Sequence, residues 1–387
     1  MGPTQLLIFQ GTPFCNIDCN YCYLPDRLDK TRISFEVISK TIERMLDANL
    51  LKEEVTVLWH AGEPMVLPIS FYEEVFHLIR AKIPKEIRVI QNIQTNLTMV
   101  NQEWCDFIKK YHVDLGISID GPEEIHDMNR ITRKGKGTFK QVVKGIELLK
   151  KNNIPIRIVS VLTKYAAMFP VDIYKFFSEI GVDYWGINID EIEADNHKSS
   201  YLINDDNYEL IYSFFSIIQK LNLDNKKPIV IRELRDAQSK VKKAPIVNID
   251  VYRPESTLLN PFDILTIGTK GDFSTFCPEL LTVKNTEKYG DLALGNVFDD
   301  SFEDVIKSRK YNLILGDIEA GIEMCRNNCE YFGLCPGGAP ANKLGEHGTF
   351  AAAETLFCHF TKKIPIDVVI EHAFKEIAII EELELSY

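Results

Sequence analysis

The sequence has no apolar run long enough to cross a membrane, since no stretch approaches the ~18 consecutive apolar residues of a spanning helix. Residues 1–10 lack the basic start and the cleavage site of a secretory signal peptide. An excess of basic residues is missing too, because the 387 residues carry a formal charge of −12, which argues against nonspecific nucleic-acid binding. We therefore expect a cytoplasmic protein that binds neither membranes nor nucleic acid.

Low-complexity segments are also absent, and 45% hydrophobic with 26% charged residues is the composition of an ordinary globular protein. At ~150 residues per domain, the length predicts two or three domains. Nine cysteines are present, and the cytosol keeps thiols reduced. We therefore interpret the clustered cysteines as metal ligands rather than disulfide partners. Cys105, in the amphipathic stretch "NQEWCDFIKKY", is instead expected in the core.

Short apolar segments alternate with amphipathic helical segments from Gln5 to about Asp224. The segments predicted to be strands are 6–9, 54–60, 87–96, 114–120, 155–163 and 183–190. Six βα units in succession predict a parallel sheet with right-handed crossovers. Six units are too few for a closed eight-stranded barrel, so the predicted fold is α/β, an open partial (β/α)6 barrel, with a doubly wound sheet as the alternative.

The alternation ends near Asp224, which divides the chain into three predicted parts. Residues 1–233 form the partial barrel, and residues 234–256 form a connection with little periodicity. Residues 257–387 form a cysteine-rich domain that ends in an amphipathic helix from about Ile366.

Three cysteines, Cys15, Cys19 and Cys22, fall in the loop after the first predicted strand. A structural zinc site and most iron–sulfur clusters take four protein ligands. Three thiolates therefore indicate a metal centre with one position left open. The segments "HAGEP" (60–64), "QTN" (94–96) and "SID" (118–120) end the next three strands, and parallel strands gather their carboxyl ends at one edge. We expect all four segments to share one rim.

The C-x3-C-x2-C spacing, with Tyr21 before the last cysteine, resembles the radical S-adenosylmethionine (SAM) enzymes. The resemblance implies that the three cysteines hold a [4Fe–4S] cluster whose remaining iron is chelated by SAM, the source of a 5′-deoxyadenosyl radical. It also implies SAM-binding roles for Tyr21, Ala61, Gly62, Glu63, Asn96, Ser118 and Arg130. Ala61 replaces a glycine of the family pattern. Taken singly, Glu63 can equally be a helix N-terminal acid, Asn96 a turn residue and Arg130 a surface charge.

A second cysteine group comprises Cys325, Cys329, Cys335 and Cys358, and four thiolates can close a zinc or an iron–sulfur site. This region and residues 294–308 resemble the C-terminal SPASM extension of radical SAM peptide-modifying enzymes, which implies auxiliary [4Fe–4S] clusters. A full SPASM pattern holds two. Here Ala339 replaces one cysteine, and no cysteine lies between Cys277 and Cys325. The resemblance therefore implies a single auxiliary cluster in a SPASM- or twitch-like domain.

The combined motifs most resemble maturases that cyclise ribosomally made peptides, including those that form cyclophanes. We therefore expect a precursor peptide as substrate, and a reductant such as flavodoxin or ferredoxin as partner. Candidate bases are Asp120, His60, Glu191 and Glu279, and Cys277 is a candidate pocket residue. The alternatives are a thioether-forming peptide maturase, an anaerobic sulfatase maturase that makes formylglycine, and a nonenzymatic zinc-binding scaffold.

Overall fold

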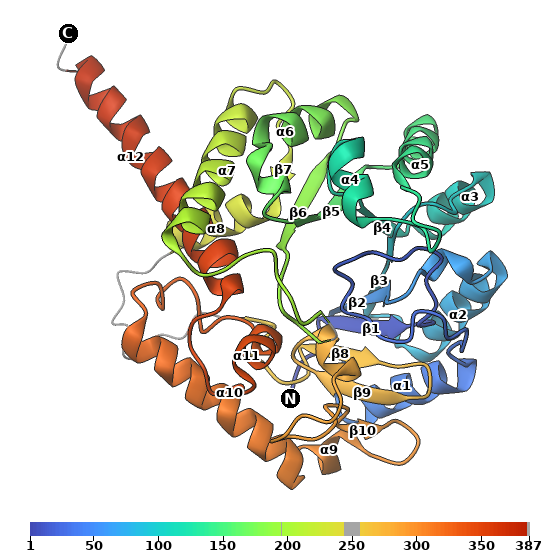
Figure 1. The fold of residues 1–387 in the computed structure, drawn as a ribbon. Helices are drawn as coiled ribbons and strands as arrows, with labels where there is room; N and C mark the ends of the chain where they lie inside the picture. Colours follow the sequence, from blue (N-terminus) through green and yellow to red (C-terminus); the bar gives the residue numbers. More distant parts are fainter. Residues whose placement is uncertain (195, 244–255, 385–387) are drawn as a thin grey trace.

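The computed structural model describes residues 1–194, 196–243 and 256–384, which fold around one mixed sheet (Figure 1). Its strands lie in the order β10-β9-β8-β1-β2-β3-β4-β5-β6-β7. Strands β1 to β7 pair in parallel, β8 pairs in parallel with β1, and β9 and β10 add antiparallel pairs. The strands are β1 (Leu6–Gln10), β2 (Glu54–His60), β3 (Arg88–Thr95), β4 (Asp114–Ser118), β5 (Arg157–Leu162), β6 (Tyr184–Ile189), β7 (Val230–Ile231), β8 (Ile264–Ile267), β9 (Asp272–Thr275) and β10 (Gly295–Asn296).

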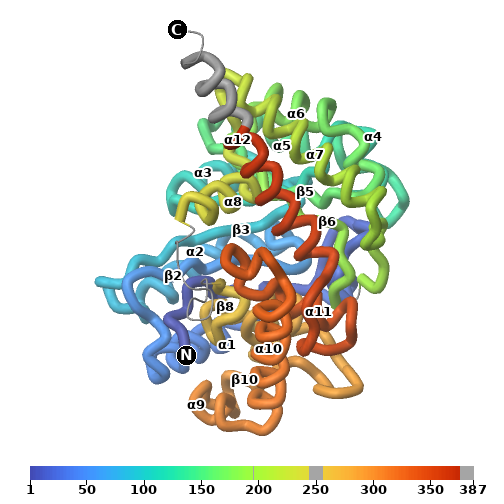
Figure 2. The backbone as a smooth tube through the Cα atoms, turned by 90° about the vertical axis from the view of Figure 1, so that its left-hand side faces the viewer, coloured from blue at the N-terminus to red at the C-terminus, as the bar shows by residue number. Residues whose placement is uncertain are grey.

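In Figure 1, helices α1 to α7 surround the outer side of the strands, whereas α10 and α11 lie at the lower left of the view. Figure 2, turned by 90°, shows α12 running past α7 and α8. The helices are α1 (Phe35–Asp47), α2 (Ile69–Lys82), α3 (Gln102–Tyr111), α4 (Glu123–Asn129), α5 (Phe139–Lys151), α6 (Pro170–Glu179), α7 (Asp205–Leu223), α8 (Arg232–Lys243), α9 (Phe302–Val305), α10 (Arg309–Asn328), α11 (Pro340–His347) and α12 (Ile364–Glu384).

The strands and helices form where the apolar pattern predicts them, because both faces of a parallel sheet are covered. In β1, Leu7 and Phe9 are fully buried and Ile8 is nearly so. In α1, Ser34 caps the first turn by accepting the Val37 N–H, and apolar residues at helical spacing face the core. The predicted partial barrel and its six βα units are confirmed. Cys105 is fully buried in α3, as predicted.

The cysteine-rich region is joined to the barrel by the sheet itself. Strand β8 pairs with β1 along Leu6–Phe9, so β1 is an interior strand between β8 and β2. Among the described residues the sheet has ten strands, where the sequence predicted six. Residues 234–243 of the predicted connection belong to α8, whose Leu234 and Ala237 are buried. Residues 244–255 of that connection lie outside the described residues.

Across the residues that the structure describes, we find no helix with both the length and the apolar character needed to span a bilayer.

Candidate active site

A cavity of about 770 Å³ opens at the carboxyl ends of the barrel strands. The four predicted rim segments meet there, because each follows a parallel strand. Of the residues singled out from the sequence, the cavity is lined by Cys15, Cys19, Tyr21, Cys22, His60, Gly62, Glu63, Asn96, Ser118, Arg130, Glu191, Cys277 and Glu279. Ala61 and Asp120 lie just behind the lining.

The loop that carries the three cysteines, residues 11–34, is held by one arginine from outside the loop and one from within it. Arg133 Nη2 donates to the Cys15 carbonyl at 2.8 Å, and Arg27 Nη1 donates to the Cys19 carbonyl at 3.1 Å. Burial raises the pKa of the Cys15 thiol to about 12, and Glu63 and the other two cysteines add to this shift. Burial likewise raises the pKa of Cys19 to about 11. Three thiols thus lie together at a buried site, where their ionised forms would need a cation nearby.

Gly62 lets the cysteine loop approach the end of β2. Its φ is +60°, and a Cβ atom there would lie 2.4 Å from the Thr12 carbonyl oxygen and 2.5 Å from that of Phe14. The neighbouring Glu63 N–H donates to the same Phe14 oxygen at 2.9 Å. Ala61 has a φ of +75°, a conformation that costs a residue with a Cβ and that a glycine adopts freely.

Glu63 is buried and accepts three hydrogen bonds. Its carboxylate receives the Met65 N–H at 2.9 Å, the Thr95 hydroxyl at 2.6 Å and the Asn96 N–H at 2.7 Å. It therefore caps the 3₁₀ helix η1 (Pro64–Val66), which is the helix N-terminal role considered from the sequence. A carboxylate has about four acceptor sites, so one remains for a ligand in the cavity.

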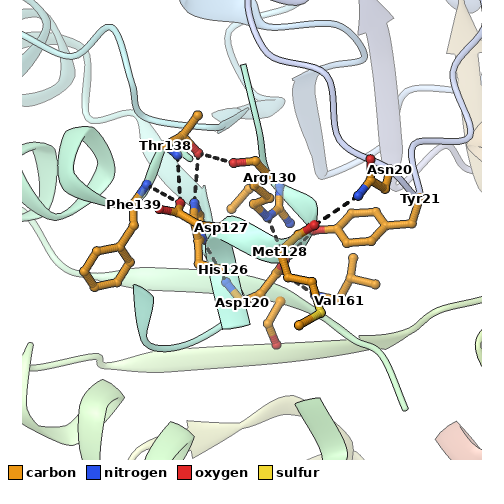
Figure 3. A network of polar contacts seen from close by, with 12 residues as sticks. Asn20, Tyr21, Asp120, His126, Asp127, Met128, Arg130, Thr138, Phe139 and Val161 are labelled. Atoms are coloured by element: carbon orange, nitrogen blue, oxygen red, sulfur yellow. Dashed lines mark hydrogen bonds and ion pairs between the residues drawn. The ribbon is translucent and has the colours of Figure 1, made fainter. Parts of the chain in front are cut away.

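Arg130 is held by a network centred on Asp120 (Figure 3). Arg130 Nε lies 3.1 Å from Asp120 Oδ2, and the Tyr21 hydroxyl donates to the same oxygen. Asp120 Oδ1 accepts the Val161 N–H at 2.9 Å. The Arg130 guanidinium also lies 5.4 Å from the centre of the Tyr21 ring. Arg130 is thus a buried, oriented cation and not a surface charge.

Asn96 and Ser118 present polar groups to the cavity from neighbouring strands. Asn96 Nδ2 donates to Asn16 Oδ1 at 2.8 Å and lies 3.8 Å from Cys15 Sγ. Gln94 Nε2 donates to Ser118 Oγ at 3.0 Å. The Asn96 amide thus supplies a donor at a thiol sulfur, the kind of contact that tunes an iron–sulfur cluster.

The cavity is also lined by the carboxyl groups of Glu191, Glu193 and Glu279. Burial raises the pKa of Glu191 to about 8 and that of Glu279 to about 7, and raises the pKa of Glu193 well above its ordinary value. Asn342 donates to Glu191 at 2.6 Å. Glu193 was not predicted from the sequence. It lies two residues after Glu191, just beyond a predicted strand, and this position could have indicated it.

His60 and Cys277 both lie in the cavity, each with a different neighbour. The Tyr23 hydroxyl is 3.1 Å from His60 Nε2, and burial lowers the pKa of His60 to about 4, so the imidazole is uncharged. Cys277 is buried, and its thiol pKa is raised first by burial and then by Glu279.

The second cysteine group, called here the auxiliary site (Cys325, Cys329, Cys335 and Cys358), lies at the end of α10 and in the loops around α11. The Cys329 N–H donates to the Cys325 carbonyl at 2.9 Å, and the Cys335 N–H donates to the Tyr331 carbonyl at 2.8 Å. The Thr355 N–H donates to Cys358 Sγ at 3.3 Å. Burial raises the pKa of Cys325 and that of Cys358, and Cys335 adds to both shifts while Cys329 adds to that of Cys325, so the four thiols lie near one another.

In neither group, nor elsewhere among the described residues, do three Cys, His, Asp or Glu side chains converge closely enough for a single metal ion. A zinc ion binds its sulfur ligands at ~2.3 Å and draws them together. A four-iron cluster spreads its thiolates, because each binds a different iron. The donor sets of the two groups, three thiols and four thiols, are of the kind that holds iron–sulfur clusters.

A family model for the radical SAM superfamily matches residues 9–166. The Synechocystis sp. protein named Uncharacterized protein sll1766 is 36% identical over 95% of this chain and 92% of its own length. A Cysteine-type anaerobic sulfatase-maturating enzyme of Clostridium novyi is 25% identical over 89% of both chains.

Two solved structures share the fold. The structure "Native anSMEcpe with bound AdoMet" has a TM-score of 0.76 at 22% identity, over 98% of this chain and 99% of that one. Streptococcus suis SuiB, bound to precursor peptide SuiA, has a TM-score of 0.61 at 15% identity, over 93% of this chain and 75% of that one.

Fold and site thus define an enzyme with a partial barrel, a three-cysteine loop at its mouth and a C-terminal cysteine region. The chain belongs to the radical SAM superfamily. Its cofactors are accordingly SAM and [4Fe–4S] clusters, one of which binds SAM and one of which is auxiliary.

Proposed function

We propose that the protein is a peptide maturase that joins two residues of one ribosomally made precursor peptide, forming a C–C cyclophane. The carrying observation is the cavity of about 770 Å³, which brings the three-cysteine loop and the carboxyl groups of Glu191, Glu193 and Glu279 to one space. When bound, the cluster and SAM supply a 5′-deoxyadenosyl radical that removes a hydrogen atom from the peptide. The residues of the chain must bind SAM, hold the peptide and take up a proton.

In this proposal Cys15, Cys19 and Cys22 hold the first cluster, and the polar rim binds SAM. Arg130 offers a cation to the SAM carboxylate. Glu63 retains an acceptor site for the SAM amino group. The apolar side chains of Ile8, Leu58 and Val159 line the same cavity and limit the access of water.

Closing a cyclophane requires the attacked ring to lose one electron and one proton. A general base works best with a pKa near the working pH, which supports Glu279 and Glu191, at about 7 and about 8. Asp120 is less suitable, because its carboxylate forms a buried ion pair with Arg130 and accepts hydrogen bonds from Tyr21 and the Val161 N–H, so protonation would break that pair. The auxiliary cluster, when bound, supplies an electron acceptor, and flavodoxin or ferredoxin supplies the electron for SAM cleavage.

The number of auxiliary clusters bears on the choice of reaction. Ala339 lines the cavity where the full pattern has a cysteine, and no cysteine lies between Cys277 and Cys325 in the sequence. The cysteines of the chain thus support a single auxiliary cluster, and this favours a crosslinking maturase over a sulfatase maturase. The similarity to a sulfatase-maturating enzyme over 89% of the chain favours formylglycine formation as the second candidate.

The test uses the reconstituted enzyme with SAM, reductant and a short peptide encoded beside its gene, deuterated at the β-carbons. A cyclophane predicts deuterium in 5′-deoxyadenosine, a peptide lighter by two hydrogens, and suppressed backbone fragments between the joined residues. Transfer of deuterium from a second peptide, deuterated at the α-carbons instead, would indicate an α-thioether. A linear product that bears an aldehyde would contradict crosslinking and support formylglycine formation. The Cys15→Ala/Cys19→Ala/Cys22→Ala variant serves as the control without radical chemistry.

A further inference from the structure

Lys343 is a buried lysine at the auxiliary site. It lies in α11 and is only 2% exposed. Its ammonium nitrogen is 3.8 Å from Cys325 Sγ, within hydrogen-bonding distance of a sulfur acceptor. Cys325 belongs to the last turn of α10, so the contact joins two helices through a cluster ligand.

The backbone around Lys343 is shaped to admit its ammonium group. Gly321 lies one turn before Cys325 on α10, and a Cβ atom there would be 3.0 Å from Lys343 Nζ. The same atom would be 2.5 Å from the Phe350 carbonyl oxygen and 2.8 Å from that of Ala352. Glycine at position 321 therefore leaves the space in which the lysine head and the 350–352 segment meet.

Within the described part of the chain, Lys343 forms no ion pair with a carboxylate. Glu346, on the same helix, instead accepts the Leu356 N–H at 2.9 and 3.0 Å. A buried ammonium needs a nearby anion, and the auxiliary thiolates are the negative groups available to it.

We propose that Lys343 acts as a fixed cation beside the auxiliary cluster and raises its reduction potential. Reduction adds one negative charge to a cluster, so a buried cation nearby stabilises the reduced form more than the oxidised form. Net charge and hydrogen bonds to sulfur are among the factors that set cluster potentials. The role as an electron acceptor for the peptide rests on the proposed function, whereas the effect on the potential does not.

Lys363 provides a matched comparison at the same site. It ends the short π-helix Cys358–Lys363, which begins at the cluster ligand Cys358. However, its Nζ donates to Glu354 Oε1 at 2.6 Å, so its charge is already paired. Replacement of Lys363 should therefore change the cluster potential much less than replacement of Lys343.

The experiment places Lys343→Met, Lys343→Arg and Lys363→Met in the Cys15→Ala/Cys19→Ala/Cys22→Ala background, which leaves only the auxiliary cluster. After anaerobic reconstitution, iron is counted and the midpoint potential is measured by a redox titration monitored by electron paramagnetic resonance. We expect about four irons per chain throughout. The midpoint should become more negative in Lys343→Met and stay near the background value in Lys343→Arg and Lys363→Met.

An unchanged midpoint in Lys343→Met with full iron would overturn the proposal. Loss of iron from both Lys343→Met and Lys343→Arg would also overturn it, because the residue would then serve the shape of the site and not its charge. Loss of iron from Lys343→Met alone, with iron retained in Lys343→Arg, would support the proposal, because the positive charge of residue 343 would then stabilise the cluster. Neither SAM nor peptide enters this assay, so its outcome is independent of whether the enzyme crosslinks peptides.

Discussion

Asp120 and Arg130 form the charged pair on which the SAM-binding side of the cavity depends. The Asp120 side chain is 2% exposed and that of Arg130 is 9% exposed, so water screens their attraction very little. Tyr21 and the Val161 N–H complete the bonding of the carboxylate. Removing the carboxylate charge would leave the Arg130 cation buried without its anion.

Asp120→Asn should therefore destabilise the fold by ~3–5 kcal/mol, the cost of breaking a buried ion pair. The matched control is Asp114→Asn, because Asp114 pairs with Arg157 between neighbouring strands but both side chains are more than 40% exposed. That exposed pair should contribute less than ~1 kcal/mol. Urea unfolding of the two variants measures the difference. Equal losses of stability would show that Asp120 does not hold Arg130 as described.

The cavity acids predict a dependence of stability on pH. Burial raises the pKa of Glu191 from 4.5 to about 8 and that of Glu279 to about 7, so the folded protein binds their protons more tightly than the unfolded chain. Their contribution to stability is therefore full below pH 4.5 and is lost as the pH rises through 7 to 8.

The Glu191→Gln/Glu279→Gln variant, which mimics the protonated acids, should lose less stability than the wild type between about pH 5 and pH 9. Urea midpoints across that range provide the measurement. A wild type and variant with parallel pH profiles would contradict the raised pKa values.

Residues at the strand ends could be located from the sequence, because parallel strands must bring their carboxyl ends together. Glu63, Asn96, Ser118 and Arg130 accordingly reach one cavity. Their partners could not be located, because hydrogen-bond geometry depends on tertiary contacts. No local pattern indicated that Tyr21, Arg130 and the Val161 N–H would all bind the Asp120 carboxylate.

Among the secondary-structure elements, the turn after β2 controls the position of the cysteine loop. Gly62 combines a positive φ with backbone oxygens inside the volume that a side chain would need. Gly135 is the matched control, because its φ is +72° but a Cβ atom there would meet nothing within 4 Å.

Gly62→Ala should displace the cysteine loop and remove the irons of the first cluster while retaining about four auxiliary irons. Gly135→Ala should cost only the ~1–2 kcal/mol of left-handed strain and keep the full complement of iron. Iron analysis of both reconstituted variants provides the measurement. Full iron in Gly62→Ala would mean that the loop does not depend on this close approach.

The bounds of the helices followed the apolar periodicity, whereas sequence patterns for helix caps were less reliable. Ser70 and Glu73 have capping-box spacing, yet α2 begins after Pro68 and has no side-chain cap. Glu73 instead accepts from Lys110 at 2.8 Å. The helix α8 was missed because its polar sequence offers few apolar positions, although Leu234 and Ala237 are buried. Tertiary packing therefore determined both where α2 begins and that α8 forms.

For the whole molecule, Asp367 joins the barrel to the auxiliary site. Asp367, in α12, accepts hydrogen bonds from Tyr208 of α7 at 2.6 Å and from Tyr331 at 2.7 Å. Tyr331 in turn accepts the Cys335 N–H through its carbonyl oxygen. A change at Asp367 should therefore reach a cluster ligand.

Asp367→Asn should destabilise the fold by ~1–3 kcal/mol and speed the loss of auxiliary iron to a chelator, because the Tyr331 anchor weakens. Tyr208→Phe, which removes only the barrel-side contact, should affect iron loss less. The rate of iron release to a chelator under anaerobic conditions tests this. Identical rates in wild type and Asp367→Asn would exclude the link.

The most direct test of the account is the iron and sulfide content of the reconstituted chain and its cysteine variants. Two four-iron clusters predict about eight irons and eight sulfides in the wild type. Replacing Cys15, Cys19 and Cys22 with Ala should leave about half of the iron and abolish SAM cleavage, and replacing the four auxiliary cysteines should leave the other half. Cys277→Ser should keep all of it. Stoichiometric zinc at the auxiliary site, or a loss of about four irons in Cys277→Ser, would contradict the account.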